Sequence, residues 1–366
     1  MRTIPYVITT SVRNFAGDMP KNEKEFIAFF DALRAKELPF VLFRLPQTQE
    51  MIIYQQLDSR HHQTKTLHEK GFVFAPFLAK VPYTFIPNQT EKRFAVPQHT
   101  AATSESIQVA SEQNKSYYTN LIAAAKKTIT ANTLKKVVVS RIHKQPFSGS
   151  VATSLLKLTH TYPNAMVYYW SHPHTGDWMG ATPETLLKIK KGHCKTMALA
   201  GTLPYEENNK PNWSSKEVDE QQMVTDFIQT QLEQIFPKNS INLSPTYTKR
   251  AGNLVHLCAD FEVSLSNVNA LDVVQLLHPT PAVAGVPVKE SLAFLTTHET
   301  HNRNYYAGIL GPIASNNMHL FVNLRCAEVE QKSLTLYVGG GITAKSDPEM
   351  EWLESQRKAE TLLHIL

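Results

Sequence analysis

The stretch GGGITAKSDPEMEWLESQRKAETLL, residues 339–363, places a predicted helix directly after three consecutive glycines. Pro348 is well suited to the first turn of a helix, where its missing N–H leaves no hydrogen bond unmade. Either Asp347 or Ser346 suits the N-cap position, and Ser346 with Glu349 also fits a capping box. We therefore expect the helix to begin at Pro348.

Two glutamates and a lysine share one face of this predicted helix. Successive helical residues turn by about 100°, so Glu351, Glu354 and Lys358 fall within about 60° of one another. The preceding glycines let the backbone approach a ligand closely and leave amide N–H groups free to bind an anion. The stretch therefore combines carboxylates, an ammonium group and accessible backbone in one place.

A second predicted helix, KEVDEQQMVTDFIQTQLEQIF at residues 216–236, carries a similar pair of carboxylates. Its apolar face is defined by Met223, Val224, Phe227, Ile228 and Ile235. Glu217 and Glu220 project on that side, where a carboxylate is unfavourable unless it is paired or bound to a metal. Oxygen ligands from two helices suit Mg²⁺, which takes few protein carboxylates and keeps several waters. The alternative is that both helices present ordinary solvated charges.

Length and composition indicate an ordinary globular protein. The chain has 366 residues, enough for one large domain or two smaller ones, and its net charge is 37 − 32 = +5. No Lys/Arg-rich run indicates nucleic-acid binding, and no apolar run approaches the ~18–20 residues of a membrane span. The N-terminus has no signal-peptide pattern, and the three cysteines are far apart and without a CxxC motif. We expect a cytoplasmic protein with reduced thiols.

The order of predicted elements favours an α+β fold. Residues 97–115 are polar and indicate a loop, and a helical pattern runs from Tyr117 to Ile129. KKVVVSRI, residues 135–142, is a β-branched run that predicts a strand. HLFVNLRCA, residues 319–327, alternates between two faces as one strand, and SLTLYVGG, residues 333–340, would pair with it as a hairpin. The regular βαβ alternation of a doubly wound sheet is missing.

Several short motifs together resemble the chorismate-utilising enzymes, which include anthranilate, aminodeoxychorismate, isochorismate and salicylate synthases. LRCA and the stretch quoted above resemble the C-terminal signature of that family. Further pieces follow its order: KVVVSR at 136–141, GATPETLL at 180–187, LAGT at 199–202, VHL at 255–257, HPTPAVAGVP at 278–287 and YAGILG at 306–311. The resemblance runs from about residue 116 to the end. It implies a catalytic core at 116–366 and a variable region at 1–115 within the same globular unit.

The resemblance implies two large β-sheets packed as a sandwich, helices outside them, and a Mg²⁺-dependent chorismate site. Glu220 and Glu354 would be the principal metal ligands, with Glu217 and Glu351 beside them. The pyruvyl carboxylate of chorismate would be held by Arg325, Tyr306 and backbone groups near Gly339. Gly201, Thr202 and Lys358 would complete the surroundings of the carboxylates and the metal. Chorismate is a dianion, which requires such cationic and amide groups.

The resemblance also distinguishes members of the family. The Arg-Asn-Asp run usual in the aminating enzymes is missing from MVTDFIQTQL, residues 223–232, and Gln221 stands where the family often has His. Ala282 is typical of isochorismate synthases, whereas the other members tend to have threonine there. By position, Lys136 would activate water for attack at C2, Glu184 would protonate the departing C4 hydroxyl, and His256 would lie near that hydroxyl. Lys136 must be neutral for this role, which burial and nearby positive charge would favour.

The sequence therefore predicts an Mg²⁺-dependent isochorismate synthase, an isomerase that would serve menaquinone or catechol siderophore biosynthesis. A salicylate synthase, which also eliminates pyruvate, is the alternative enzyme. A non-catalytic chorismate-binding protein is the third possibility, but it would require broken catalytic positions. We expect a monomer that acts on a small molecule, without an amidotransferase subunit, nucleic acid or membrane as partner.

Overall fold

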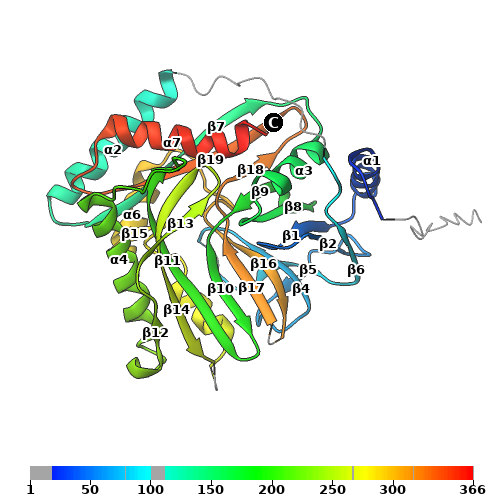
Figure 1. The fold of residues 1–366 in the computed structure, drawn as a ribbon, viewed down its shortest axis with the longest axis horizontal. Helices are drawn as coiled ribbons and strands as arrows, with labels where there is room; N and C mark the ends of the chain where they lie inside the picture. Colours follow the sequence, from blue (N-terminus) through cyan, green and yellow to red (C-terminus); the bar gives the residue numbers. More distant parts are fainter. Residues whose placement is uncertain (1–18, 79, 100–111, 266–267, 316, 366) are drawn as a thin grey trace, which may run out of the picture.

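Two large antiparallel β-sheets and seven α-helices make up the described part of the chain, so the predicted α+β architecture is confirmed (Figure 1). The computed structural model describes residues 19–78, 80–99, 112–265, 268–315 and 317–365. The helices are α1 (Glu23–Arg34), α2 (Glu112–Thr130), α3 (Val151–Thr161), α4 (Ser215–Leu232), α5 (Ala270–Leu277), α6 (Val288–His298) and α7 (Pro348–Leu363), and a 3₁₀ turn is η1 (Lys238–Ser240). No helix in the described ranges is both long enough and apolar enough to cross a membrane.

The first sheet joins strands from both ends of the chain. In spatial order they are β15 (Gly285–Val286), β7 (Lys136–Pro146), β19 (Ser333–Ile342), β18 (Cys326–Val329), β9 (Gly176–Thr182), β8 (Met166–His172), β1 (Phe40–Arg44), β2 (Glu50–Gln55) and β6 (Thr90–Ala95). The longest pairing in this sheet is between β7 and β19, from Ser333 opposite Pro146 to Ile342 opposite Val137. This pairing holds the glycine-rich end of β19 beside the start of β7, which carries Lys136.

The second sheet also joins strands that are far apart in the sequence. Its order is β12 (Asn242–Leu243), β14 (Leu254–Ser264), β11 (His193–Pro204), β10 (Thr185–Lys190), β17 (Asn317–Val322), β16 (Ile309–Ala314), β4 (Gly71–Ala75), β5 (Tyr83–Pro87) and β3 (Gln63–Thr64), and β13 (Tyr247–Ala251) pairs with β14. Strands from residues 40–95 thus take part in both sheets, together with strands from the C-terminal two thirds of the chain.

Alternating side chains of the first sheet separate two apolar cores. On β8, Tyr168 and Trp170 point into the core shared with the second sheet, where the Trp170 ring lies 5.0 Å from that of Phe74 on β4. Val167 and Tyr169 point to the opposite face, where the Tyr169 ring lies 4.8 Å from that of Phe30 on α1. The period of two along a strand therefore produces one core that faces the second sheet and another that is shared with α1, α3 and α7.

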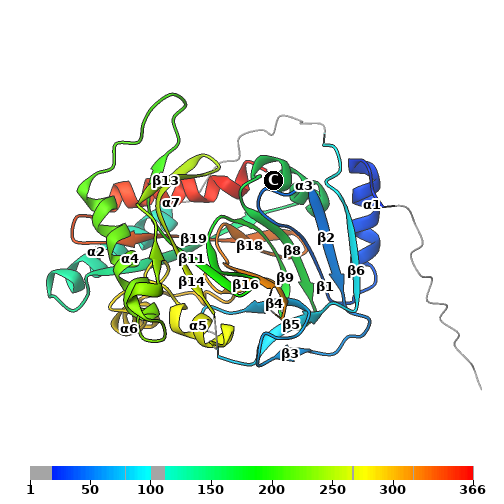
Figure 2. The same cartoon turned by 60° about the horizontal axis from the view of Figure 1, so that its bottom comes forward.

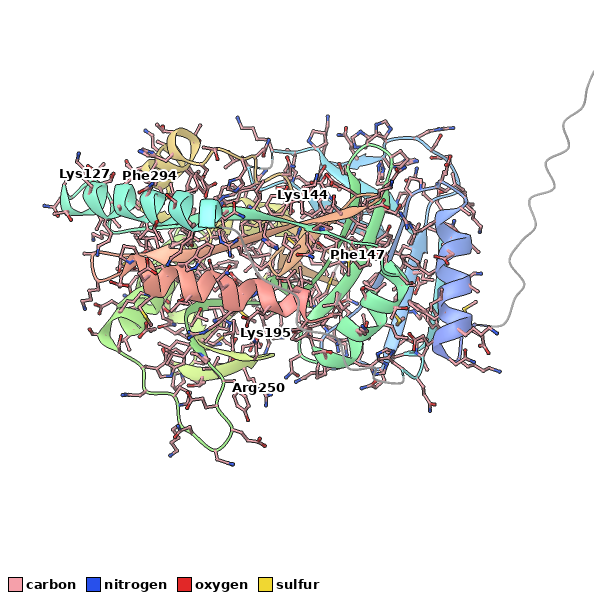
Figure 3. The ribbon with its side chains drawn as sticks, turned by 90° about the horizontal axis from the view of Figure 1, so that it is seen from above. Lys127, Lys144, Phe147, Lys195, Arg250 and Phe294 are labelled. Atoms are coloured by element: carbon pink, nitrogen blue, oxygen red, sulfur yellow. The ribbon has the colours of Figure 1, made fainter. Side chains whose placement is uncertain are left out.

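The helices cover the outer faces of the sheets. Helices α1 and α3 contribute to the second core, and α2 and α7 contact β7 and β19 on the same sheet (Figures 1 and 2). Seen from above, α2 and α7 run beside one another (Figure 3). Helix α4 packs on β11 of the second sheet. The two helices with paired glutamates, α4 and α7, therefore pack against different sheets.

The predicted single strand over 319–327 is wrong. Strand β17 ends at Val322 in the second sheet, and β18 begins at Cys326 in the first sheet, so residues 323–325 cross between the sheets. Asn323 holds the crossing because its side chain accepts a hydrogen bond from Tyr168 and donates one to the Tyr305 carbonyl. The predicted hairpin exists, but it joins β18 alone to β19.

Element boundaries are confirmed in part. Helix α7 begins at Pro348 with Asp347 as its N-cap, whereas the Ser346 hydroxyl accepts a hydrogen bond from the Thr343 amide, so the capping box of Ser346 with Glu349 is not formed. Residues 100–111 of the predicted loop lie outside the described residues, and 112–115 already belong to α2. The predicted strand over 135–142 corresponds to β7, and the three cysteines are free and buried.

The apolar face predicted for residues 216–236 is shifted in the folded protein. Val224 and Ile228 are buried, but Ile235 lies beyond the end of α4 and is 37% exposed. Glu217 and Glu220 do turn inward, as predicted, although Glu217 closes a capping box with Ser214 at the start of the helix.

Candidate active site

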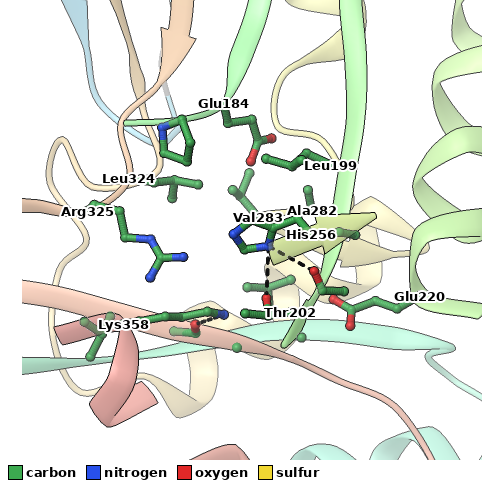
Figure 4. Close-up of a pocket in the computed structure, with 18 of the residues that line it drawn as sticks. Glu184, Leu199, Thr202, Glu220, His256, Ala282, Val283, Leu324, Arg325 and Lys358 are labelled. Atoms are coloured by element: carbon green, nitrogen blue, oxygen red, sulfur yellow. Dashed lines mark hydrogen bonds between the residues drawn. The ribbon is translucent and has the colours of Figure 1, made fainter. Parts of the chain in front are cut away.

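A pocket lies where the two sheets, α4 and α7 meet, and it collects residues from widely separated motifs (Figure 4). Ten residues of the predicted site line it: Glu184, Gly201, Thr202, Glu220, His256, Ala282, Tyr306, Arg325, Gly339 and Lys358. Arg325 and Lys358 enter from one side, Glu220 from the opposite side, and Glu184 from above. The motifs are thus joined by tertiary structure into one site.

The other four predicted residues lie outside the pocket lining. Lys136 is fully buried, and its Nζ lies 3.0 Å from Glu220 Oε1. Glu351 and Glu354 face the glycine segment of β19, because a Cβ added at Gly340 would lie 3.3 Å from Glu351 Oε2 and 3.9 Å from Glu354 Oε1. Glu217 is held at the start of α4. These side chains form a layer of charge directly behind the pocket wall.

Glycines in β19 make room for this layer. A Cβ at Gly341 would collide with the Glu220 carboxylate and lie 2.9 Å from Lys136 Cε. Only glycine therefore allows α4 to bring Glu220 against the strand that pairs with β7. All three glycines of the quoted stretch line the pocket, and Gly340 and Gly341 also allow the glutamates to approach.

Arg325 presents an unneutralised cation to the pocket. It sits on the crossover between the sheets with φ of +50°, and its Nη1 is buried without a hydrogen-bond partner. Within the described residues no carboxylate forms an ion pair with it, and burial lowers the pKa of its guanidinium. A buried guanidinium without a counter-charge is a strong binding point for a ligand carboxylate.

Glu184 is a buried acid aimed into the pocket. It follows β9 in the TPE turn and is 4% exposed, and its backbone carbonyl accepts a hydrogen bond from the Val322 amide. Burial raises the pKa of its carboxyl group to about 7, although Lys136, Lys249 and Arg325 oppose this rise. A carboxylic acid that keeps its proton near neutral pH is suited to general acid catalysis.

His256 is a neutral imidazole with a defined tautomer. Its Nδ1 lies 2.9 Å from the Gly201 carbonyl oxygen, which can only accept, so Nδ1 carries the proton. Its Nε2 is buried without a partner, and burial lowers the pKa of the ring to about 3. Nε2 is therefore a hydrogen-bond acceptor at the pocket, available to a ligand hydroxyl.

Three lysines neutralise three glutamates of the charged layer. Lys136 pairs with Glu220, Lys358 Nζ lies 2.6 Å from Glu354 Oε1, and Lys216 Nζ lies 2.6 Å from Glu351 Oε1. Lys358 also donates a hydrogen bond to the Gly339 carbonyl. Burial opposes ionisation of Glu354, but Lys358 and Lys216 outweigh it and lower its pKa, whereas burial and repulsion by Glu354 raise the pKa of Glu351.

The donor set fits a divalent cation that prefers oxygen. Glu351 is 1% exposed, and neither of its carboxylate oxygens accepts a well-aligned hydrogen bond. In the described part of the chain, no three His, Cys, Asp or Glu side chains already stand together as a metal-binding group. Mg²⁺ does not require such a cage, because it binds through one or two carboxylates and retains waters. The assignment of Glu217, Glu220, Glu351 and Glu354 to a metal stays a prediction.

A buried ion pair behind the pocket was not predicted. Arg303 and Glu299 are 4% and 5% exposed and are joined by two hydrogen bonds. Arg303 also donates to the carbonyls of Val283 and Val138, both of which line the pocket. This pair ties the segment that carries Ala282 to β7. No sequence signal distinguished it, because HETHNRN, residues 298–304, resembles an ordinary polar loop.

We expect Arg303→Met to lower the free energy of unfolding by about 3–5 kcal/mol, because it leaves Glu299 buried without its counter-charge. Urea unfolding followed by tryptophan fluorescence measures this change. Arg93→Met is the matched control, since Arg93 is 49% exposed in its pairs with Glu50 and Glu91; we expect a loss below about 1 kcal/mol there. Equal effects of the two substitutions would contradict the structural role of Arg303.

Fold and site together define a binding protein for a small anion, and comparisons with known proteins identify the family. The family model described as chorismate binding enzyme matches residues 34–366, so the chain belongs to the chorismate-binding enzymes. The match begins well before residue 116, where the recognisable motifs start.

Known relatives agree with this assignment. The isochorismate synthase MenF of Escherichia coli K12 is 30% identical over 264 residues, which cover 69% of this chain and 61% of that protein. The isochorismate synthase EntC of the same strain is 28% identical over 277 residues, covering 72% and 71%. The solved structure of E. coli MenF has a TM-score of 0.75 at 21% identity, covering 90% of this chain and 88% of that chain. That of Bacillus anthracis DhbC has a TM-score of 0.78 at 19% identity, covering 94% and 99%.

Proposed function

We propose that this protein is an isochorismate synthase, which interconverts chorismate and isochorismate. Water adds at C2 of the ring and the C4 hydroxyl leaves as water, so the composition of the molecule is unchanged. The observation that carries the proposal is that one pocket brings together a buried acid, Glu184, whose pKa is raised to about 7, and a buried guanidinium, Arg325, whose Nη1 has no hydrogen-bond partner. Membership of the family and the two named isochorismate synthases support the choice of substrate.

Recognition of the dianion would rest on the cationic side of the pocket. Arg325 would bind the pyruvyl carboxylate, with Tyr306 and the backbone near Gly339 beside it. Lys358 is held against the Gly339 carbonyl and would add positive charge at the same wall. A planar guanidinium can bind a carboxylate through two hydrogen bonds, which orients the ligand as well as holding it.

Glu184 and His256 would act at the departing hydroxyl. Hydroxide leaves poorly, so the oxygen must receive a proton as the bond breaks, and Glu184 holds a proton near pH 7. His256 Nε2 has no protein partner and would accept a hydrogen bond from that hydroxyl, which fixes its direction. The two side chains thus have separate tasks, one donating and one accepting.

Lys136 would serve as the base for the attacking water, with the glutamates of α4 and α7 holding a magnesium ion. Glu220 and Glu354, with Glu217 and Glu351 beside them, would hold Mg²⁺, which would bind the ring carboxylate of chorismate and neutralise its charge. In exchange, Glu220 would give up its ion pair with Lys136, 3.0 Å long in this structure. The ammonium group of Lys136 would then have to release one proton to solvent, after which the neutral amine could accept a proton from the attacking water.

Ala282 favours isochorismate as the final product. It lines the pocket where salicylate-forming and aminating members tend to have threonine. The named relatives include both a menaquinone-specific and a 2,3-dihydroxybenzoate-specific enzyme by their descriptions. Isochorismate is common to both uses, so the proposal names the reaction rather than the pathway.

The test is product analysis by chromatography after purified protein is mixed with chorismate, with and without Mg²⁺. We expect a mixture of chorismate and isochorismate that reaches equilibrium, and no conversion in EDTA. Salicylate with an equal amount of pyruvate would instead identify a salicylate synthase. If no product forms with Mg²⁺ present, the proposed catalytic roles of Lys136 and Glu184 are wrong.

A further inference from the structure

Lys216 is a largely buried lysine to which the proposed reaction assigns no role. It lies in the first turn of α4, and its side chain is 19% exposed. Its Nζ is 2.6 Å from Glu351 Oε1 on α7 and 4.0 Å from Glu217 Oε1 on its own helix. Glu354 and Glu220 also interact electrostatically with it. A single ammonium group is therefore within 4.0 Å of two of the carboxylates assigned to the metal and interacts electrostatically with the other two.

An ammonium group and a metal ion exclude one another at the same carboxylate oxygen. Lysine carries three N–H donors and no lone pair when charged, so it cannot join the coordination of a metal. A cation that bound Glu351 would take the oxygen that Lys216 now contacts, and it would repel the ammonium at close range. Lys136 and Lys358 form similar pairs, but both belong to the proposed catalytic and substrate-binding groups.

We propose that Lys216 is a tethered competitor of the divalent cation: it occupies the Glu351 carboxylate in the metal-free protein and weakens metal binding. This inference rests on the magnesium site of the proposed function. Because Lys216 belongs to α4 and Glu351 to α7, the same ion pair joins the two helices when no metal is bound. A metal that takes Glu351 Oε1 would break this link, so Lys216 would set the concentration range over which the site fills.

The experiment is calorimetric titration of Mg²⁺ into the protein of residues 1–366 without chorismate. For Lys216→Met we expect the dissociation constant to fall by about tenfold or more, because a close positive charge is removed. Lys216→Arg keeps the charge and should bind Mg²⁺ no more tightly than the wild type. Lys216→Gln is a second neutral replacement, which should also bind more tightly.

Lys345→Met is the matched control for the loss of one positive charge near these helices. Lys345 Nζ lies 2.6 Å from Asp219 on α4, but both side chains are 52% exposed. Solvent and salt screen this pair, so we expect the dissociation constant for Mg²⁺ to stay within about twofold of the wild type.

Thermal unfolding separates competition from a merely structural role. Without metal, Lys216→Met should unfold at a lower temperature than the wild type, because Glu351 remains buried without its partner. Added Mg²⁺ should raise the midpoint more in the variant than in the wild type. A lower midpoint with unchanged Mg²⁺ affinity would overturn the proposal and leave Lys216 as a structural link. A wild type that binds no Mg²⁺ would overturn both this proposal and the metal site, whereas unchanged affinity in an active, Mg²⁺-binding enzyme overturns this proposal alone.

Discussion

Glu184→Gln is expected to lower kcat for the conversion of chorismate by about 10²–10⁴-fold, because the leaving hydroxyl loses its proton donor. Glutamine preserves the shape of the side chain, so substrate binding should change little and the loss should appear in kcat rather than KM. Steady-state rates from the chromatographic assay measure the effect. A rate within threefold of the wild type would show that another group protonates the hydroxyl.

The same substitution should change the pH dependence of the rate. Burial raises the pKa of Glu184 to about 7, so the acid form is lost as pH rises through that value. The kcat/KM of the wild type should therefore fall above about pH 7, and this fall should be missing from the residual rate of Glu184→Gln. Glu328→Gln is the matched control, because burial also raises the pKa of Glu328 but it lies outside the pocket lining.

Glu184 should also affect stability, with a sign opposite to that of most carboxylates. The folded protein binds this proton more tightly than the unfolded chain, in which the pKa is near 4.5. Its contribution to stability is thus fully present below about pH 4.5 and is lost as pH rises through about 7. The free energy of unfolding of Glu184→Gln, taken relative to that of the wild type, should therefore be higher at pH 8 than at pH 4.5. Urea unfolding of both proteins at the two pH values measures this change.

Lys136→Ala is expected to lower kcat by a similar factor of about 10²–10⁴, because the attacking water loses its base. Lys136 is fully buried, so the substitution also leaves a cavity and removes the partner of Glu220. Lys136→Met retains most of the volume and should be as inactive as Lys136→Ala. Circular dichroism of both variants checks that the fold survives.

A small amine distinguishes a base from a structural lysine. Added methylamine or ethylamine should restore part of the activity of Lys136→Ala, since the cavity can admit the amine, but none of the activity of Lys136→Met. Lys144→Ala is the control on the same strand, because Lys144 is 62% exposed and pairs with Glu330. Full activity in Lys136→Ala would show that the assignment of the base is wrong.

Local patterns predicted the elements that carry the site better than they predicted how those elements join. The helix from Pro348 and the strand that begins at Lys136 were recoverable because proline, helical spacing and β-branched runs act over a few residues. The break at residues 323–325 was not, because alternation continues through it: Leu324 and Cys326 keep the period of a strand although the chain changes sheets. Tertiary contacts, such as those of Asn323 with Tyr168 and Tyr305, mark the crossing.

The ten predicted residues that line the pocket were identified through the resemblance of their motifs to the family. Their spacing along the sequence did not predict that they lie together. The burial of the Arg303 and Lys216 ion pairs was not predicted from the sequence, for a physical reason. A surface ion pair and a buried one have the same sequence signature, and Lys216 next to Glu217 resembles the charged first turn of any helix. Their burial becomes evident only when Val138, Val283 and Glu351 are brought against them from other elements.

The sequence by itself determined the residue types of the site and the helices on which its glutamates lie, because periodicity and capping depend on neighbours along the chain. Tertiary structure alone decided their electrostatic state. Burial keeps a proton on Glu184 near neutral pH, removes it from His256, and leaves Arg325 without a counter-charge. These properties depend on burial and on charges from residues far apart in the sequence, such as Arg325 near Glu184. Coulomb energy falls with distance and with solvent exposure, so these properties arise only when the chain is folded.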